Sequence, residues 1–503
     1  MKRVVTGALV VTGDGESILE GVDVLIVGGR VERIAANLAG PGIEVIDARG
    51  SVVMPGLVNL HVHGVSPGPL MPSGGRPLPR WKWMENLDRH LTQGTTAVLN
   101  LCGLSTMDSV NVANDAHPVR VGGATTHEPM AVSAALAADG AGLTEDVLKT
   151  TVAEQIALGA VAIGELGGGQ TLAGGGQDVV YLPAAFLDRY QVRVEPWQAR
   201  LLKEAVLGRS LEWLAEGAVA LAEERVDAAL MDAGLKGELQ AAAVVDTVRA
   251  VVLPSLTPAL AGIEEGIRLA GVHGVPAFVH SAAVTGGLLT SLAQSSTGAR
   301  IVASHVNHPS YLPDEAIELA RLGRAAGWAN EACVFDLVHQ REMVTSREHW
   351  DAVFDAGDLI DVIATDYGPG GKHDSLLHAV KDLVDGNRRS LAQAVRLVTS
   401  APAELVPGLT PAAGRLTPGG IADLVIAERG DISVVRDVLV DGMTVVRNGV
   451  VDYHTAPVLS CDEFARLESV VGADIALGDE DAIAASHREL QARVSDLRNW
   501  MSR

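Results

Sequence analysis

Short apolar runs alternate with helix-like stretches along the middle of the chain. Eight of these runs are rich in Val, Ile and Ala, as parallel strands covered on both faces are. Helical periodicity separates most of them, for example in TEDVLKTTVAEQIALGA and PDEAIELARLGRAAG. Eight strand–helix units predict an α/β fold, a (β/α)8 or TIM barrel. The runs are LVNLHVHG, TAVLNLCG, VRVGGATTHEP, AVAIGELGGG, PAFVHSAA, RIVASHVNHP, GWANEACVFD and LIDVIATDYGPG.

Strand-like segments also stand at both ends of the chain. The early ones are VVTGALVVTG, VDVLIVGGRVERIAAN and IEVIDARGSVVMPG, and the late ones are ADLVIAERG and DVLVDGMTVVRNGVVDY. Asp441-Gly442 and Asn448-Gly449 are dipeptides that tight hairpin turns select. We expect residues 1–55 and 412–455 to pair into one small composite β-sandwich domain, with the barrel over residues 56–411 between them.

One gap between the predicted strands is longer than a strand–loop–helix unit requires. Between Glu165 and His280 there are about 80 extra residues, and residues 180–255 are rich in Ala, Leu and Glu at helical spacing. We interpret this segment as a helical insertion beside the barrel mouth, either a lid or an oligomer contact. Residues 456–503 show helical periodicity too, and we interpret them as an appended helical tail.

Charge and composition narrow the classes of partner. Lys and Arg number 39 against 62 Asp and Glu, and the resulting net charge of −23 repels phosphate backbones, so no nucleic-acid partner is expected. No run approaches the ~18 unbroken apolar residues of a membrane span, and glycines interrupt the signal-like N-terminus. Three scattered cysteines indicate a reducing cytoplasm. We therefore expect a cytoplasmic homo-oligomer that acts on a small molecule and has no membrane partner.

Histidines and carboxylates stand at the ends of the predicted barrel strands. His61 and His63 close the first run one residue apart, and alternate residues of a strand project to the same side. Fifteen randomly placed histidines would give about 0.4 such pairs, so the pair alone is a weak motif. Barrel active sites, however, collect at the C-terminal ends of strands. Histidine nitrogens and carboxylate oxygens gathered there suit Zn²⁺ or Fe²⁺ better than they suit packing in the core. The same position in other runs belongs to Glu165, His280, His305 and Asp366.

Further residues have both a functional and a structural interpretation. His127 ends the third run and is a candidate substrate contact, and His308 is a candidate extra ligand or substrate donor. A structural or solvated role is the favoured interpretation of either histidine. Cys102 and Cys333 also end predicted strands, where we expect small buried hydrophobes. The glycines of ELGGGQTLAGGGQ predict a substrate-facing loop whose backbone approaches another group closely.

The string PGLVNLHVHG resembles the first-strand signature of the amidohydrolase superfamily. The sheet segments at both ends resemble the composite β domain that many of its members carry. The resemblance covers nearly the whole chain except residues 180–255 and the tail. It implies that His61, His63 and Asp366 hold the more buried metal ion, that His280 and His305 hold the second, and that Glu165 bridges both.

Two features separate this chain from other members. Many members bridge their metals with a carboxylated lysine, whereas AVAIGELGGG contains no lysine, and its Glu165 is similar to the bridging residue of enamidase, a cyclic-amide hydrolase. The usual acid two residues before the first histidine is replaced by Asn59, which forms hydrogen bonds but brings no charge. The acid that deaminase members show near the sixth strand is absent from the sequence pattern, which lowers the rank of base deamination.

The leading hypothesis is hydrolysis of a C–N bond in a cyclic amide or amide-like substrate. Two divalent ions, Zn²⁺ or Fe²⁺ or else Mn²⁺, would generate a metal-bridging hydroxide, with Asp366 as general base. The alternative is a non-haem di-iron monooxygenase on the same barrel that hydroxylates a bulky apolar or carrier-linked substrate. His308, Asn59 and the insertion favour that alternative. A metal-stabilised scaffold without catalysis is a third interpretation.

Overall fold

The computed structural model describes residues 1–169, 171–172, 176–210, 218–295, 298–334, 347–366, 374–410 and 413–453, without the side chains of residues 218–222. The helical tail expected over residues 456–503 lies outside these described residues, as do parts of the glycine-rich loop.

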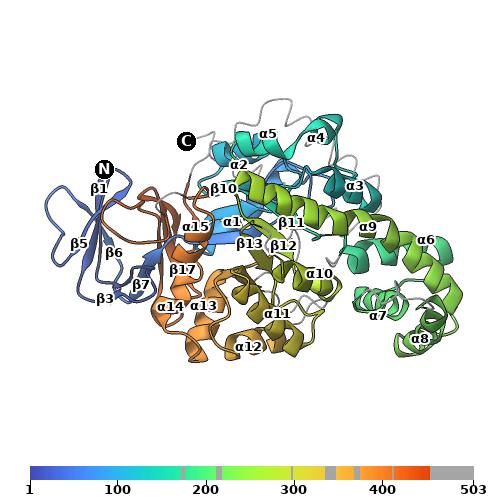
Figure 1. The fold of residues 1–503 in the computed structure, drawn as a ribbon. Coiled ribbons are helices and arrows are strands. Elements are labelled where there is room, and N and C mark those ends of the chain that lie inside the picture. The colour runs from blue at the N-terminus through green and yellow to red at the C-terminus, as the bar shows by residue number, and fades with distance from the viewer. Residues whose placement is uncertain are drawn as a thin grey trace. The chain divides into compact units, whose positions relative to one another are not determined.

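A parallel eight-stranded barrel forms the centre of the fold, as predicted (Figure 1). Each strand coincides with one of the eight apolar runs, and neighbours in sequence are neighbours in the sheet. The last strand lies against the first, which brings the barrel to closure. The strands are β8 (Leu57–Val62), β9 (Thr95–Asn100), β10 (Arg120–Thr125), β11 (Ala162–Leu166), β12 (Ala277–His280), β13 (Ile301–Ser304), β14 (Ala329–Cys333) and β15 (Val362–Ala364).

Helices cover the outside of the barrel because their apolar faces pack on the buried strands. Several begin at a residue whose hydroxyl accepts a backbone N–H three positions later, as Thr106, Thr151 and Ser390 do. These helices are α1 (Arg80–Thr92), α2 (Met107–Ala116), α3 (Pro129–Ala138), α4 (Glu145–Lys149), α5 (Val152–Ala157), α10 (Ala283–Ala293), α11 (Pro313–Ala325), α12 (Arg347–Asp355), α13 (Leu376–Asp385), α14 (Leu391–Arg396) and α15 (Ser400–Leu405).

The strands at both ends of the chain form the additional sheet domain. Antiparallel pairing of β7 with β16 joins the early segment to the late one, and β7 leads directly into barrel strand β8. Arg120 of β10 pairs with Asp423 and Asp441, which ties the barrel to this domain. The four-stranded sheet comprises β5 (Arg30–Ala35), β4 (Asp23–Val27), β1 (Lys2–Thr6) and β6 (Glu44–Asp47), and the seven-stranded sheet comprises β19 (Val450–Val451), β18 (Met443–Arg447), β17 (Val435–Val440), β16 (Leu424–Glu428), β7 (Ser51–Pro55), β2 (Leu9–Val11) and β3 (Ile18–Leu19).

The long gap between β11 and β12 is helical. A π-helical turn (Gln177–Tyr181) precedes α6 (Leu182–Tyr190), α7 (Pro196–Leu207), α8 (Ala218–Asp232) and α9 (Ala241–His273). The first three helices and the start of α9 share an apolar cluster of their own, separate from the barrel core. Helix α9 does not end at the expected boundary near residue 255. Its second half packs on α3, where Gly262 lets the two backbones approach: an added Cβ would lie 3.2 Å from the nitrogen of Ala131.

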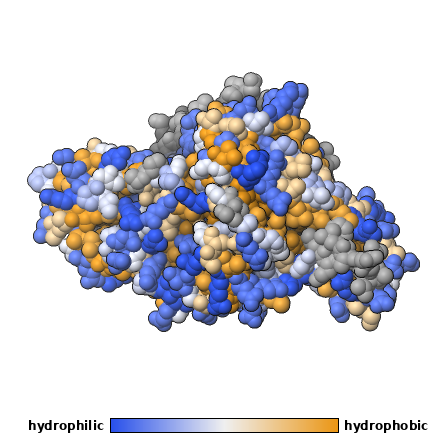
Figure 2. Space-filling model, viewed as in Figure 1, coloured by the Kyte–Doolittle hydropathy of each residue, from blue (hydrophilic) through white to orange (hydrophobic). Residues whose placement is uncertain are grey.

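Helix α9 is also the one helix among the described residues with the length and composition to cross a membrane. Just under half of its most apolar stretch is buried inside the protein, where it packs on α3 and β11. Apolar residues also reach the viewed surface along this helix (Figure 2). A core helix of a barrel passes the same test of length and composition.

Two arginines of the insertion bind the loop that follows β13. Arg200 donates to the carbonyl oxygen of Pro309 at 3.3 Å. Arg209 donates to the carbonyl oxygen of Ser310 at 3.1 Å and forms a two-pronged pair with Glu315, at 2.6 and 2.7 Å. The insertion is therefore fixed to the segment that leads from His305 into α11.

The separate core of the insertion generates a prediction. Phe186 is fully buried in that core, whereas the next residue, Leu187, is 47% exposed. Phe186→Ala should cost about 3–5 kcal/mol of local stability because it leaves a cavity, and limited proteolysis should then cleave the inserted helices faster. Leu187→Ala should change the cleavage rate little. Equal rates for the two variants would show that the insertion does not depend on this core.

Candidate metal centre

The six side chains predicted as ligands meet at the carboxyl ends of the barrel strands. Parallel strands end at one rim, so residues far apart in sequence come together there. Five of the side chains are buried, and Asp366 is 26% exposed at the opening. The six are His61, His63, Glu165, His280, His305 and Asp366.

The two carboxylate oxygens of Glu165 face different pairs of imidazoles. Oε2 lies 3.7 Å from Nε2 of His61 and 3.5 Å from Nε2 of His63. Oε1 lies 3.1 Å from Nε2 of His305 and in direct contact with Nδ1 of His280. One carboxylate thus stands between two sets of nitrogen donors.

Asp366 completes the set on the side of the first pair. Its Oδ1 lies 3.7 Å from Nε2 of His61 and 3.5 Å from Nε2 of His63. Asp366 and His305 both have left-handed backbones, with φ of 49° and 57°. Non-glycine residues adopt this conformation only where surrounding contacts stabilise it, and such positions concentrate at functional sites.

This arrangement fits divalent cations. Ligands about 2.0–2.2 Å from a tetrahedral ion lie about 3.3–3.6 Å from one another, close to the separations around Oε2 of Glu165 and Oδ1 of Asp366. Nε2 of His61 and Nε2 of His280 are buried with no hydrogen-bond partner among the described residues. Two groups of three donors, each within 4.8 Å, share Glu165: one with His61 and His63, the other with His280 and His305.

The charges of the cluster show how strongly its members interact. Burial lowers the pKa of His61, but the carboxylates of Glu331 and Glu165 outweigh burial and raise that pKa to about 10. Burial likewise opposes the charge on His63, but the hydrogen bond that its ring donates to Asp366 and the hydrogen bond with Cys102 raise the pKa of His63 well above its usual value. For Glu165, burial raises the pKa, but the positive charges of His280 and His61 hold it well below the ordinary range.

Residues 270–451, which include three of the six side chains, match the sequence model of the amidohydrolase family. This match covers about a third of the chain, and over that part the chain is similar to the amidohydrolase family. The nearer likeness to enamidase stays a prediction.

Curated relatives resemble this chain over short stretches. The dihydroorotase of Streptomyces coelicolor is 43% identical over 67 residues, 13% of this chain and 14% of that protein. The dihydroorotase of Solibacter usitatus is 50% identical over 46 residues, 9% of this chain and 11% of that protein. The chain thus matches only about a seventh of the length of these relatives, or less.

Solved structures resemble this chain over most of its length. The β-aspartyl dipeptidase of Fervidobacterium islandicum AW-1, in complex with β-Asp-Leu, has a TM-score of 0.53 at 14% identity and covers 91% of this chain and 100% of that one. A prolidase complexed with N-methylphosphonate-L-proline has a TM-score of 0.51 at 17% identity and covers 89% and 100%. At these identities the likeness establishes the fold.

Three side chains lie behind the imidazoles, and the sequence predicted no role at the site for any of them. Oε1 of Glu331 lies 2.9 Å from Nδ1 of His61. The two cysteines, predicted as small buried hydrophobes, are buried, but both also contact histidines. Sγ of Cys333 lies 2.9 Å from Nδ1 of His305, and Sγ of Cys102 lies 3.6 Å from Nδ1 of His63. A charged residue inside the apolar run GWANEACVFD was the available signal for Glu331.

The side chain of Asn59 connects the first barrel strand to the segment after the last one. Its side-chain amide donates to Oγ1 of Thr365 at 2.7 Å, and its oxygen accepts from the backbone nitrogens of Thr365 and His61 at 3.3 and 3.2 Å. Asn59 therefore latches the first barrel strand to the segment after the last one, beside Asp366.

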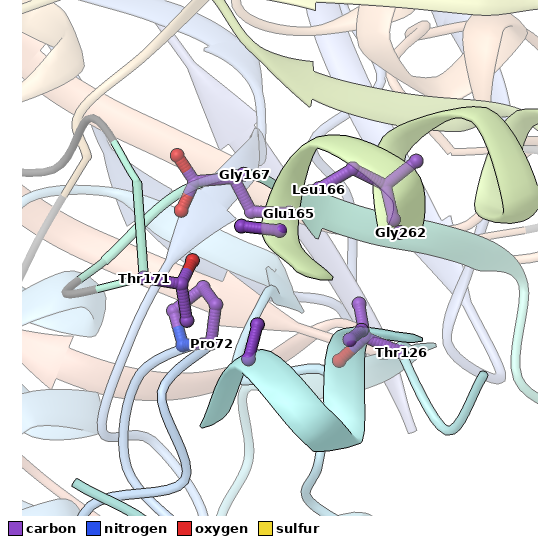
Figure 3. Close-up of a pocket in the computed structure, with 10 residues that line it drawn as sticks. Pro72, Thr126, Glu165, Leu166, Gly167, Thr171 and Gly262 are labelled. Carbon is purple, nitrogen blue, oxygen red and sulfur yellow. The ribbon is translucent and has the colours of Figure 1, made fainter. Parts of the chain in front are cut away.

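The described part of the glycine-rich loop covers the carboxylate of Glu165. A Cβ at Gly168 would overlap the carboxyl carbon and both oxygens of Glu165, so the predicted close approach of this backbone is found there. A pocket adjoins Glu165 (Figure 3). Apart from Glu165 its lining is small and mainly apolar, and it includes Pro72, Thr126, Ala131, Leu166, Thr171 and Gly262.

The two further candidate histidines belong to neither group of three donors around Glu165. Nδ1 of His127 lies 2.9 Å from Oγ1 of Thr125, and burial lowers the pKa of His127 to about 4. The ring of His308 lies 5.2 Å from that of His280, and its Nδ1 lies 2.7 Å from Oγ of Ser310. Burial, and then the positive charge of His280, hold the pKa of His308 well below its usual value. Their roles toward substrate stay predictions.

The close approach of Gly168 to the Glu165 carboxylate generates a prediction. Gly168→Ala should destabilise the fold by about 1–3 kcal/mol because a methyl group is forced into the space of the Glu165 carboxylate. Gly287 of α10 is the matched control, since an added Cβ meets nothing within 4 Å there. Urea unfolding of both variants and of wild type checks this, and a midpoint of Gly168→Ala no lower than that of wild type would show that the loop yields without cost.

Glu128, at the start of α3, is a buried acid near this pocket. It is fully buried, and neither carboxylate oxygen has a hydrogen-bond partner among the described residues. Its Oε1 lies against Gly266 of α9, 3.2 Å from where a Cβ would stand. Burial raises its pKa to about 8, with a further contribution from the charge of Glu265.

This raised pKa sets the sign of a pH dependence. Between about pH 4.5 and pH 8 the folded chain keeps a proton on Glu128 that the unfolded chain has lost, so this residue makes stability fall as pH rises, by up to about 1.4 kcal/mol per pH unit. Relative to wild type, Glu128→Gln should therefore be more stable at pH 9 than at pH 6 in urea unfolding. The exposed Glu264→Gln is the control, and a pH-independent difference for Glu128→Gln would contradict the prediction.

Proposed function

We propose that this protein is a dinuclear metal-dependent hydrolase that cleaves a C–N bond of a cyclic amide or amide-like substrate. The observation that carries this proposal is the division of the two Glu165 oxygens between two sets of imidazoles. A structural metal site surrounds one ion with protein ligands on all sides. Here Glu165 would serve two ions, and the partly exposed Asp366 lies on the open side of the site. His61, His63, Glu165 and Asp366 would hold one divalent ion, and Glu165, His280 and His305 the other.

The chemistry of the site follows from its donors. Bound divalent ions would acidify a water molecule and polarise the substrate carbonyl oxygen. Asp366 is the carboxylate nearest the opening; burial raises its pKa, but the charge of His305 and a hydrogen bond with His63 lower it below the ordinary value. Its ionised carboxylate accepts the proton of the attacking water as the C–O bond forms. The same proton then passes to the leaving nitrogen as the C–N bond breaks.

The pocket beside Glu165 favours a substrate group that is small and largely uncharged. The pocket there presents mainly apolar groups, together with the hydroxyls of Thr126 and Thr171. The similar structures carry the names β-aspartyl dipeptidase and prolidase, and the similar sequences the name dihydroorotase. We extend the proposal to a cytoplasmic homo-oligomer acting on small molecules, with ions drawn from Zn²⁺, Fe²⁺ and Mn²⁺.

Asp366→Asn tests the proposed proton transfer. With Zn²⁺- or Mn²⁺-loaded protein and a panel of dihydroorotate, other cyclic amides, β-aspartyl dipeptides and prolyl dipeptides, kcat should fall about 10²–10⁴-fold. Asn keeps an oxygen donor, so metal content measured by mass spectrometry should persist. Asp361→Asn, just before β15 and at its opposite end, is the control and should keep wild-type turnover.

The same preparation separates the hydrolase from the di-iron alternative. Protein purified without added metal should contain two divalent ions per chain and consume no oxygen. Two irons per chain with oxygen consumption, and no amide turnover under any metal, would overturn the proposal in favour of an oxygenase.

A further inference from the structure

We propose that Glu331 is a positioning residue that orients His61 for metal binding and supplies the outer charge that position 59 lacks. The inference rests on the proposed function only in that His61 is taken to bind an ion. Glu331 touches no proposed ligand atom; it acts through the ring of His61.

The contact is close and dry. Glu331 lies within β14, fully buried, and Oε1 is 2.9 Å from Nδ1 of the equally buried His61. Its other oxygen, Oε2, has no partner among the described residues. A buried carboxylate is unfavourable unless a partner balances its charge. Among the described residues, the shortest hydrogen bond of the Glu331 carboxylate is with the ring of His61. The backbone of Glu331 is also fixed, since its carbonyl oxygen accepts from the nitrogen of Val306.

This contact selects the tautomer of His61. When Nδ1 carries the proton and donates it to Glu331, Nε2 keeps its lone pair. Nε2 is the atom that faces Oε2 of Glu165 and Oδ1 of Asp366, each at 3.7 Å. A carboxylate behind a histidine ligand fixes its ring and raises its basicity in this way.

Position 59 does not supply this charge. The side chain of Asn59 is engaged with Thr365 and with the backbone of His61, not with an imidazole. The acid behind His61 comes from the seventh barrel strand, β14, and not from the first, β8. Both strands end at the same rim, so either can reach the ring of His61.

Two of the other rings, those of His63 and His305, have weaker outer partners. Cys102 lies behind His63 and Cys333 behind His305, and thiols are weak acceptors of hydrogen bonds. The support that Glu331 gives is therefore directed to the ion held by His61.

Glu331, Cys333 and the Nδ1 atoms of His61 and His305 also lie within 4.8 Å of one another. As a cation site of its own this cluster would need both Nδ1 atoms without protons, while the Nε2 atoms of the same rings face Glu165. We therefore assign the cluster to support of the ligands, and metal stoichiometry decides between the two assignments.

The test is a Zn²⁺ titration of metal-stripped full-length protein against a chromogenic chelator. Wild type should bind two equivalents, and Glu331→Gln should weaken one of them about 10–100-fold. Glu331→Asp, which keeps the charge but shortens the reach, should show a smaller loss and guards against a variant that fails to fold. Glu128→Gln is the matched control, the same substitution at an equally buried acid without a ligand contact, and should bind as wild type does.

A second readout distinguishes positioning from a merely structural role. With Co²⁺ in place of Zn²⁺, the visible absorption bands of Glu331→Gln should shift because the geometry at one ion changes. Wild-type Zn²⁺ affinity and unchanged Co²⁺ bands in Glu331→Gln would overturn this inference alone. A third equivalent that both Glu331→Gln and Cys333→Ala lose would overturn it in favour of a separate cation site. A wild type that binds no metal would overturn the proposed function as well.

Discussion

One buried carboxylate shared by four imidazoles is the interaction on which the site depends. Glu165 is withdrawn from water at the end of β11, and each of its oxygens faces two ring nitrogens. Burying this charge among strands is unfavourable without such partners. The barrel provides them because its parallel strands all end at one rim, so that three strands other than β11 contribute the four imidazoles.

The rim is held by a second layer of contacts. Glu331 and the two buried cysteines stand behind three of the rings, Asn59 latches the ends of the first and last strands together, and Gly168 brings backbone over the central carboxylate. These contacts restrict how the rings rotate before any ion binds. A site that is already arranged loses less entropy when it takes up its ligand.

The barrel and the meeting of the six side chains followed from the sequence because both depend on simple periodicity. Strands covered on both faces read as apolar runs, and polar residues at their ends share one rim. The partners behind the rings could not be read in the same way. Whether an imidazole meets Glu331 or a thiol depends on strand register, which shifts irregularly within β8 and between β11 and β12. The end of the insertion was also hidden, because α9 continues through Pro254 and Pro258, two residues that ordinarily break helices.

The arginine contacts of the insertion have a consequence for engineering. Arg200 and Arg209 grip the carbonyl groups of Pro309 and Ser310, in the stretch that continues from His305 and His308. Exchanging the inserted helices for those of another barrel would release that stretch together with its histidines. A chimera built here would have to transplant the downstream loop and the first turn of α11, with Glu315, along with the helices.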